Sequence, residues 1–173
     1  VRWPRIVKGS LSNVEANLTE GKPDSTDKKA PARKPKPSVL SINVCDTIIR
    51  DEGTKKVSLI GLFNTIKANS FPCTHPQMYV YVALTNGHGT YNTEVRFVRI
   101  NTDKPLAGIA GELAFPSPLH VVELNVCWQG LRFEEPGDYL VEVLCDGDAV
   151  GDRKFRIIGA QQQMPPTDGT EVR

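Results

Sequence analysis

Short apolar runs separated by turn residues fill the middle of the chain, from about residue 38 to residue 160. In most of these runs apolar and polar side chains alternate, which is the period of a half-buried β-strand. Gly, Pro, Asn and Asp gather between the runs, and these residues are typical of turns. The pattern predicts eight strands, at 39–46, 57–68, 78–85, 91–102, 107–115, 120–133, 139–146 and 152–160.

The spacing of these strands indicates the fold class. No segment with helical periodicity and capping signals lies between them, so the crossover helices of a parallel sheet have no place. The Asn86-Gly87 pair, between the third and fourth strands, is a strong signal for a β-hairpin. We predict an all-β fold, an immunoglobulin-like antiparallel β-sandwich of about eight strands that spans residues 38–160.

The two ends of the chain have a different composition. Residues 21–37 contain no large apolar side chain, so they cannot bury enough surface to offset the entropy lost on ordering. We predict that residues 1–37 form a disordered basic arm and residues 161–173 a disordered tail. The arm has nine Lys/Arg and four Asp/Glu, a net charge of +5. Nucleic acid is an unlikely partner, reached only through this arm, because residues 21–37 lack aromatic side chains that stack on bases.

Several sequence features indicate where the protein works. No run approaches the roughly 18 apolar residues of a transmembrane helix, and the first residues lack the apolar core of a signal peptide. The cysteines form no C-x-x-C motif and are expected to be reduced thiols. They are Cys45, Cys73, Cys127 and Cys145. We therefore expect a cytoplasmic protein with no membrane partner.

Three acidic residues stand close together in LCDGDAVGDRKFRI, residues 144–157: Asp146, Asp148 and Asp152. A calcium loop of the EF-hand type needs acids at positions 1, 3 and 5 and Glu at position 12. Here Val150 stands at position 5, where the third acid belongs, and Ile157 replaces the glutamate. Two alternating runs flank the loop, and Asp and Gly suit the positive φ angles of tight turns. We predict a hairpin turn, with no metal and no cofactor.

A search for catalytic motifs finds no strong match. The chain has no G-x-S-x-G, no H-E-x-x-H and no phosphate-binding G-x-x-x-x-G-K-[ST]. Cys73 and His75 form a C-x-H pair that could join His88 and His120 in a zinc site. Zinc needs three or four converging ligands, and the chain has no second closely spaced pair. We therefore favour a loop histidine and a half-buried thiol over a metal site.

The alternation assigns side chains to the core. Trp128 shares one face of its strand with Val122, Leu124 and Val126, so we expect its ring between the sheets. Val95 and Phe97 are expected to face inward as well. The alternation fails after Phe97, which predicts either a β-bulge there or a strand that is covered on both faces.

The same alternation places two tyrosines on an outer face. Tyr79 and Tyr81 fall outside in the strand 78–85, and Arg96 and Glu94 fall outside in the strand 91–102, which we expect to be its partner. Exposed Tyr next to Arg is common in binding patches. Cross-strand packing on a solvated sheet is the more ordinary explanation, because isolated surface aromatics are frequent.

Three stretches resemble a family of small uncharacterised bacterial proteins over about residues 40–158. They are CDTIIRDEGTKKVSLIGLFNTI, FPCTHPQMYVYVAL and LRFEEPGDYLVEVLCDGDAV. The shared features are a Cys-Asp near the first strand, an Ile-Gly-hydrophobic-Phe segment, a Phe-Pro before the third strand and a Phe-x-x-Pro-Gly-x-Tyr near the end. The resemblance implies a compact immunoglobulin-like β-sandwich and no particular activity.

These observations favour one function over two others. We expect a non-enzymatic protein-interaction or structural module with an unknown protein partner. One alternative is a glycan- or peptide-binding sandwich that uses the Tyr79/Tyr81 face with Arg96. The other is a metal-dependent enzyme that uses the Cys73/His75 loop.

Overall fold

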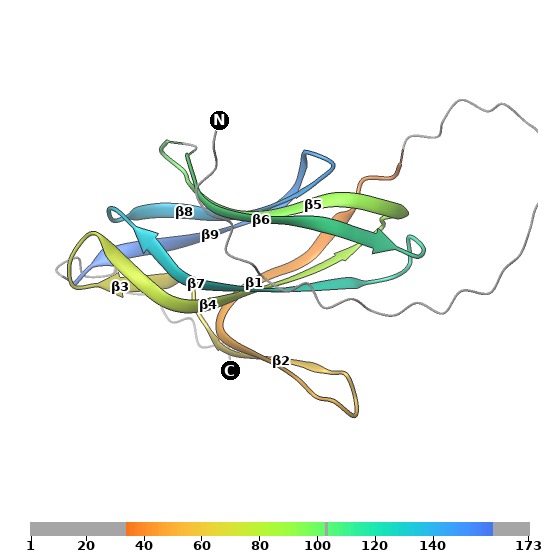
Figure 1. Ribbon diagram of the computed structural model, residues 1–173, viewed down its shortest axis with the longest axis horizontal. Coiled ribbons are helices and arrows are strands. Elements are labelled where there is room, and N and C mark those ends of the chain that lie inside the picture. Colours follow the sequence, from red (N-terminus) through yellow and green to blue (C-terminus); the bar gives the residue numbers. More distant parts are fainter. Residues whose placement is uncertain (1–33, 103, 161–173) are drawn as a thin grey trace, which may run out of the picture.

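The computed structural model describes residues 34–102 and 104–160 (Figure 1). Nine strands and no helix occur in this part of the chain. The strands are β1 (Ser38–Arg50), β2 (Val57–Leu62), β3 (Thr65–Ala68), β4 (Cys73–Thr85), β5 (Gly89–Arg99), β6 (Lys104–Phe115), β7 (Val122–Phe133), β8 (Gly137–Cys145) and β9 (Asp148–Gly159). The all-β prediction is confirmed for these residues. The disorder predicted for residues 1–33 and 161–173 falls outside the described part.

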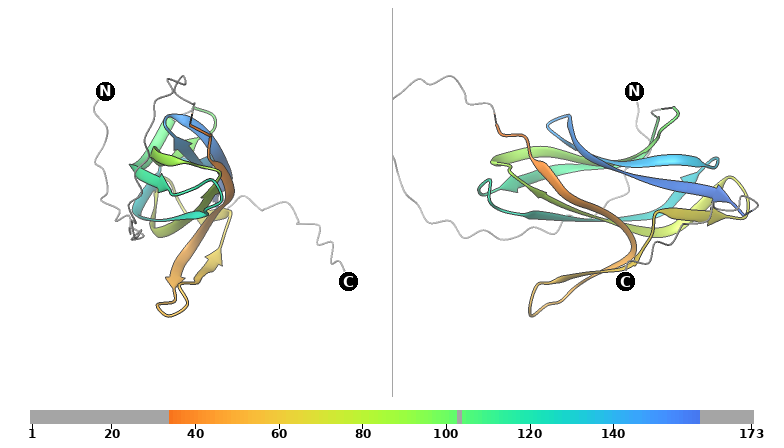
Figure 2. Two further views of the ribbon diagram at one scale, coloured as in Figure 1. Left: turned by 90° about the vertical axis from the view of Figure 1, so that its right-hand side faces the viewer. Right: turned by 180° about the vertical axis from the view of Figure 1, so that it is seen from behind.

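The strands form two sheets that face each other (Figure 1). Sheet A has the order β2-β1-β4-β7, and sheet B has the order β3-β9-β8-β5-β6. The two sheets curve around the core when they are viewed end-on (Figure 2). One side of the sandwich is closed by contacts between β1 and β9, where Arg153 Nη1 donates to the Ile42 carbonyl at 2.8 Å. No helix of the described residues is long and apolar enough to cross a bilayer.

The run 57–68, predicted as one strand, is two strands in different sheets. Gly61 has a φ of +67°, and after Leu62 the chain crosses from sheet A to sheet B. There β3 pairs with β9 in parallel, with Thr65 opposite Arg156 and Ala68 opposite Gly159. Where about eight antiparallel strands were predicted, the described residues thus form nine, of which β3 and β9 pair in parallel. Continuous apolar character hid the crossing, because Phe63 and Ile66 pack against the core on both sides of it.

The Asn86-Gly87 turn does not make a hairpin. Asn86 has the expected positive φ of 63°, but β4 before it belongs to sheet A and β5 after it to sheet B. The turn is an arch between the two sheets. A Cβ atom on Gly87 would lie 2.4 Å from Cγ of Phe115, so the backbone passes directly against that buried ring. A turn that local chemistry alone assigns to a hairpin thus connects the two sheets and packs against Phe115.

The predicted core side chains are buried between the sheets. Trp128 is 4% exposed and packs edge-on against Phe97, with ring centroids 5.1 Å apart and planes at 85°. Such aromatic pairs stabilise a core beyond the area that they bury. The ladder between β5 and β6 shifts register between Phe97 and Val98, where either a bulge or a strand covered on both faces was predicted, and Val98 is buried as well as Phe97. Val122, at the start of β7, is only half-buried.

The acidic stretch forms a hairpin turn, as predicted. Asp146 and Gly147 have φ angles of 50° and 85° and connect Cys145 of β8 to Asp148 of β9. Two positive φ angles are typical of a type I′ turn. Asp146 also accepts the Asn92 N–H at 2.9 Å, whereas Asp152 lies opposite Glu142 within the ladder. Within residues 34–102 and 104–160, no three His, Cys, Asp or Glu side chains are grouped to hold a metal ion.

The ordered contacts begin before the predicted boundary at residue 38. Pro37 is buried, and the Tyr91 hydroxyl donates to the Pro35 carbonyl at 2.6 Å. Lys34 Nζ donates to the Thr90 carbonyl at 2.6 Å and lies 5.1 Å from the centroid of the Tyr91 ring. Residues 34–37 therefore lie on the sandwich.

Two truncations test this contact. Deleting residues 1–33 is expected to change the free energy of unfolding by less than about 0.5 kcal/mol. Deleting residues 1–37 is expected to cost about 1–2 kcal/mol more, because it removes the partner of the Tyr91 hydroxyl and uncovers the surface under Pro37. Urea denaturation of both proteins measures the difference. Equal stability of the two truncated proteins would contradict the contact.

Candidate functional site

The two predicted site tyrosines lie side by side on the outer face of sheet A. On β4 they alternate with the buried residues Met78, Val80 and Val82, so their rings point away from the core. Tyr79 lies opposite Cys45 of β1 and Cys127 of β7, and Tyr81 lies opposite Asn43 and Asn125. We call this surface the tyrosine face; its members are Asn43, Cys45, Tyr79, Tyr81, Glu123, Asn125 and Cys127.

Arg96 does not belong to the tyrosine face. It points outward from β5, between the buried Val95 and Phe97, but β5 is in sheet B. Its Nε donates to Glu142 Oε2 at 2.8 Å. The prediction that strands 78–85 and 91–102 are partners was wrong because their connection is an arch. The tyrosines and Arg96 therefore lie on the outer faces of different sheets and cannot form one patch.

Both tyrosine hydroxyls are already engaged within the protein. Tyr81 donates to Glu123 Oε1 at 2.7 Å, and Tyr79 accepts from Gln77 Nε2 at 3.0 Å. Burial, and then the hydrogen bond to Glu123, raise the pKa of Tyr81 to about 12. Both rings are half-buried. The tyrosine face is thus a packed polar layer rather than an open platform for stacking.

The β1–β2 hairpin lies below this face. Figures 1 and 2 show that the hairpin leaves the sandwich and turns back beneath sheet A. The distance between the hairpin and sheet A increases towards the tip of the hairpin. The bend is at Asp46 and Gly61, where a Cβ atom on Gly61 would lie 2.2 Å from Asp46 Oδ2. Arg50, near the tip, reaches back to β7 and donates to Glu123 Oε2 at 2.8 Å. Glu123 therefore joins the hairpin to the tyrosine face.

The charge of Glu123 depends on these two partners. Burial favours its neutral form, but the hydrogen bonds from Tyr81 and Arg50 and the Arg50 charge outweigh it and lower the pKa of Glu123. A carboxyl group with a lowered pKa stabilises the folded state above its ordinary pKa. That contribution is lost as the pH falls through the lowered pKa in the folded protein.

Glu123→Gln should therefore change how stability depends on pH. We expect the variant to be about 1–2 kcal/mol less stable at pH 7, where the ionised side chain accepts two hydrogen bonds. This difference in stability should decrease as the pH falls below 4.5, the ordinary pKa of a Glu side chain. Chemical denaturation at several pH values measures it. Glu134→Gln, at an exposed pair with Arg132, is the control and should change little. If the difference in free energy of unfolding between wild type and Glu123→Gln did not change with pH, the lowered pKa of Glu123 would be contradicted.

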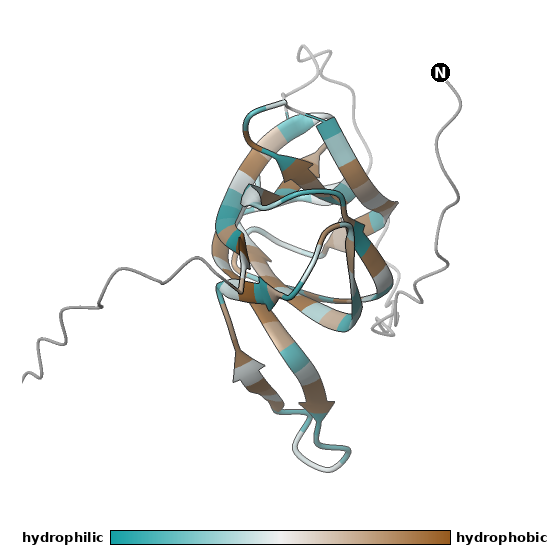
Figure 3. Ribbon diagram, turned by 90° about the vertical axis from the view of Figure 1, so that its left-hand side faces the viewer, coloured by the Kyte–Doolittle hydropathy of each residue, from teal (hydrophilic) through white to brown (hydrophobic). Residues whose placement is uncertain are grey.

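The β1–β2 hairpin carries exposed aliphatic side chains. Ile49, Ile60 and Leu62 are 50%, 49% and 57% exposed, and we call them the hairpin patch. Figure 3 shows apolar segments along both strands of the projecting hairpin. β2 is also an edge strand, and its six residues, VSLIGL, include no charge and no proline. Charges and prolines are the usual protection of exposed strand edges.

Sequence reasoning missed this surface. The run 57–68 was predicted only as one strand, and its continuous apolar character does not show which of its side chains are exposed. The signal that could have found it is Gly61 in the middle of the run. A glycine inside a strand pattern often marks a bulge or a bend, and here the bend carries the apolar residues out of the core.

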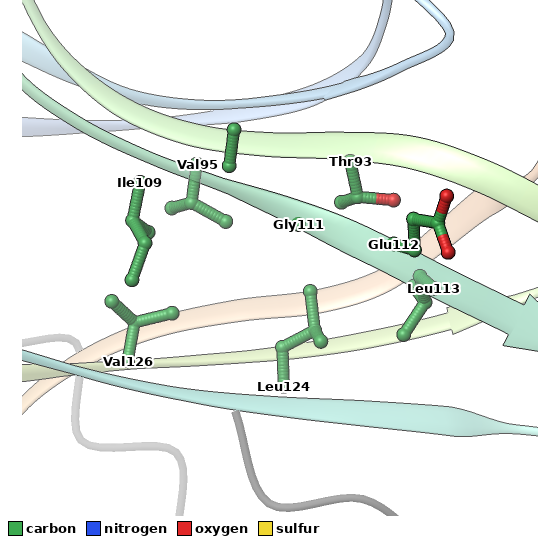
Figure 4. Close-up of a pocket in the computed structure, with 9 residues that line it drawn as sticks. Thr93, Val95, Ile109, Gly111, Glu112, Leu113, Leu124 and Val126 are labelled. Atoms are coloured by element: carbon green, nitrogen blue, oxygen red, sulfur yellow. The ribbon is translucent and has the colours of Figure 1, made fainter. Parts of the chain in front are cut away.

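A small apolar hollow lies between the two sheets. Figure 4 shows an apolar cavity of about 10 Å³ between β5, β6 and β7. It is lined mainly by Val95, Ile109, Leu113, Leu124 and Val126. This volume is about that of one water molecule, whereas sites for small molecules are usually hundreds of Å³. The cavity is therefore a packing defect rather than a ligand site.

A second hollow, of about 700 Å³, lies between residues 34–37 and the β8–β9 turn. Three of its polar side chains, those of Lys34, Tyr91 and Asp146, make contacts within the protein. Asp146 accepts from the Asn92 N–H and pairs with Lys34 at 3.4 Å, and Tyr91 bonds Pro35. Lys36 and Asp148 complete its polar lining, and these two side chains alone do not define a specific small-molecule site.

The Cys73/His75 pair lies at one end of the core. Both residues are half-buried on β4, and the His75 ring is 5.7 Å from the ring of Phe63. Burial lowers the pKa of His75, and no hydrogen-bond partner of its Nε2 occurs in the described residues. His120 is engaged by Ser117 Oγ through Nδ1 at 2.8 Å. Within the described residues, the geometry provides no set of three ligands for zinc.

Comparisons with known proteins place residues 40–158 within the model of DUF6941, described as a family of unknown function. No curated protein matches the chain. Among solved structures, one similar chain is the alkylpurine DNA glycosylase AlkC of Pseudomonas fluorescens bound to DNA containing an abasic site analog. The identity is 13% and the TM-score 0.37, over 55% of this chain and 27% of the glycosylase. Such a likeness carries no argument about function.

Proposed function

Because the chain belongs to DUF6941, a family of unknown function, over residues 40–158, we propose a function from its geometry. The protein is a non-enzymatic interaction module that binds a protein partner through the β1–β2 hairpin. The observation that carries this proposal is the hairpin patch on an edge strand without charges. Aliphatic side chains that project together from a folded domain are typical of interaction sites, because they lose unfavourable contact with water when a partner covers them.

The experiment compares matched surface variants. Ile60→Ser with Leu62→Ser removes two members of the hairpin patch, and Leu40→Ser removes an equally exposed leucine from the other end of β1. Each protein should stay within about 1 kcal/mol of wild-type stability, because all three side chains are exposed. In cross-linking in cells, the partner recovered with wild type and Leu40→Ser should be lost with the hairpin variant. If the hairpin variant still recovered the same partner, the proposal would be contradicted.

The glycan- or peptide-binding alternative has less support. It relied on Tyr79, Tyr81 and Arg96 acting together, and Arg96 lies on the other sheet. A ligand that stacks on the tyrosines would also have to separate Arg50 and Tyr81 from Glu123. The metal-dependent enzyme has less support still, because the described residues bring no third ligand to Cys73 and His75.

The proposal also covers the fold family, the origin of the protein and its location in the cell. We propose an immunoglobulin-like sandwich, supported by Tyr139, whose hydroxyl donates to the Glu135 carbonyl at 2.7 Å. A tyrosine that bonds backbone a few residues upstream is a feature of immunoglobulin-like domains. We also propose a bacterial, cytoplasmic protein that works without a cofactor, a membrane or nucleic acid.

A further inference from the structure

We infer that the partner of the hairpin is a second copy of this chain, joined by antiparallel pairing of β2 with β2 around Leu59. This inference rests on the proposed function and names its partner. It follows from three features of β2: its free backbone edge, its aliphatic side chains and the charges at its two ends.

The free edge is open at the centre of the strand. The carbonyl of Lys56 accepts the Asp51 N–H at 2.9 Å, so the backbone of Lys56 faces β1. Backbone groups of successive residues in an antiparallel strand point to alternate sides. The N–H and C=O groups of Val57 and Leu59 therefore point to the edge of sheet A that has no neighbour among residues 34–102 and 104–160. Two copies related by a twofold axis at Leu59 can exchange both hydrogen bonds of this residue.

The side chains fit the same register. With Leu59 opposite Leu59 of the second copy, Ile60 lies opposite Ser58 and diagonal to the second Ile60. Val57 lies opposite Gly61, over which the Asp46 side chain of the second copy stands. The stem of Lys56 lies opposite Leu62, which is 57% exposed in the single chain. Aliphatic pairs across and diagonally between strands stabilise a sheet, and lysine stems cover apolar surface.

The charges at the two ends of β2 are complementary between copies. Asp46 stands over Gly61 at one end, and Lys55 precedes the other end; both are exposed. Within the described part of the chain, neither side chain has an ionic partner. In this register Lys55 of one copy is diagonal to Gly61 of the other, within reach of Asp46 for a long side chain. The twofold axis produces this pair twice.

Light scattering on the full chain tests the pairing. We expect wild type to reach twice the chain mass of 19.1 kDa with increasing concentration. Leu59→Pro removes an N–H that faces the free edge and not β1, so the hairpin should fold while dimerisation weakens at least about tenfold. Leu40→Ser, far from β2, should dimerise like wild type. A dimer unchanged by Leu59→Pro would place the interface elsewhere and overturn the inference.

Charge reversal gives a second test that does not depend on a proline. Asp46→Lys and Lys55→Asp should each weaken the dimer about tenfold, because each places like charges together. The double variant should restore most of the wild-type affinity, and its dimer should weaken at high salt. Additive losses in the double variant would overturn the proposed register. A wild type that stays monomeric would overturn the self-pairing, yet leave the proposed function standing if cross-linking still recovers a different protein through the hairpin.

Discussion

Trp128→Ala is expected to lower the free energy of unfolding by about 3–5 kcal/mol. The ring is 4% exposed and packs against Phe97 between the two sheets. Its removal costs the transfer energy of a large aromatic group and leaves a cavity that neighbours on strands cannot close. A domain of this size has roughly 5–15 kcal/mol of stability in total, so part of the variant should be unfolded or aggregated at physiological temperature.

The control lies on the next residue of the same strand. Gln129 is exposed on the opposite face, so Gln129→Ala should cost less than about 1 kcal/mol. Chemical denaturation with a fluorescence readout measures Gln129→Ala, and circular dichroism serves for the variant without Trp128. Equal and small losses for both variants would mean that Trp128 is not enclosed by the two sheets.

Gly87→Ala is expected to cost about 1–3 kcal/mol. The added Cβ would lie 2.4 Å from Cγ of Phe115, a ring that is fully enclosed in the core. Either the ring or the arch between β4 and β5 must shift, and both are held by neighbouring strands. Gly87 has no positive φ, so the loss would come from crowding and not from backbone strain.

A glycine in open surroundings provides the comparison. The nearest atom to a Cβ on Gly53 is Asp51 Oδ1 at 3.6 Å, in the turn at the tip of the β1–β2 hairpin. Gly53→Ala should therefore leave stability within about 0.5 kcal/mol of wild type. Thermal unfolding of the two variants separates crowding from a general effect of removing glycine. A Gly87→Ala protein as stable as Gly53→Ala would mean that the arch is not pressed against Phe115.

Local alternation was sufficient to predict most strands and the direction of most side chains. Trp128 and Phe97 face inward and Tyr79, Tyr81 and Arg96 face outward because the period of a strand is a local property. Which strands are neighbours is not a local property. The Asn86-Gly87 pair is a hairpin signal, yet it connects two sheets, and Gly87 packs against Phe115, 28 residues away.

The candidate site was less predictable than the fold. The hairpin patch consists of Ile49, Ile60 and Leu62, and aliphatic residues in strands are ordinarily counted as core. Their exposure results from the bend at Asp46 and Gly61, which is a tertiary feature of two strands together. The role of Glu123 was also hidden, because its partners Arg50 and Tyr81 are 73 and 42 residues distant.

The position of β9 has a consequence for synthesis of the protein. This last described strand lies between β3 and β8, so a nascent chain that lacks it has two unpaired edges in sheet B. The parallel ladder of residues 65–68 can form only after residues 156–159 have been synthesised. Contacts this distant in sequence slow folding and prolong the exposure of strand edges. The domain is therefore completed only after β9 has left the ribosome, and until then the edges of β3 and β8 that β9 covers stay unpaired.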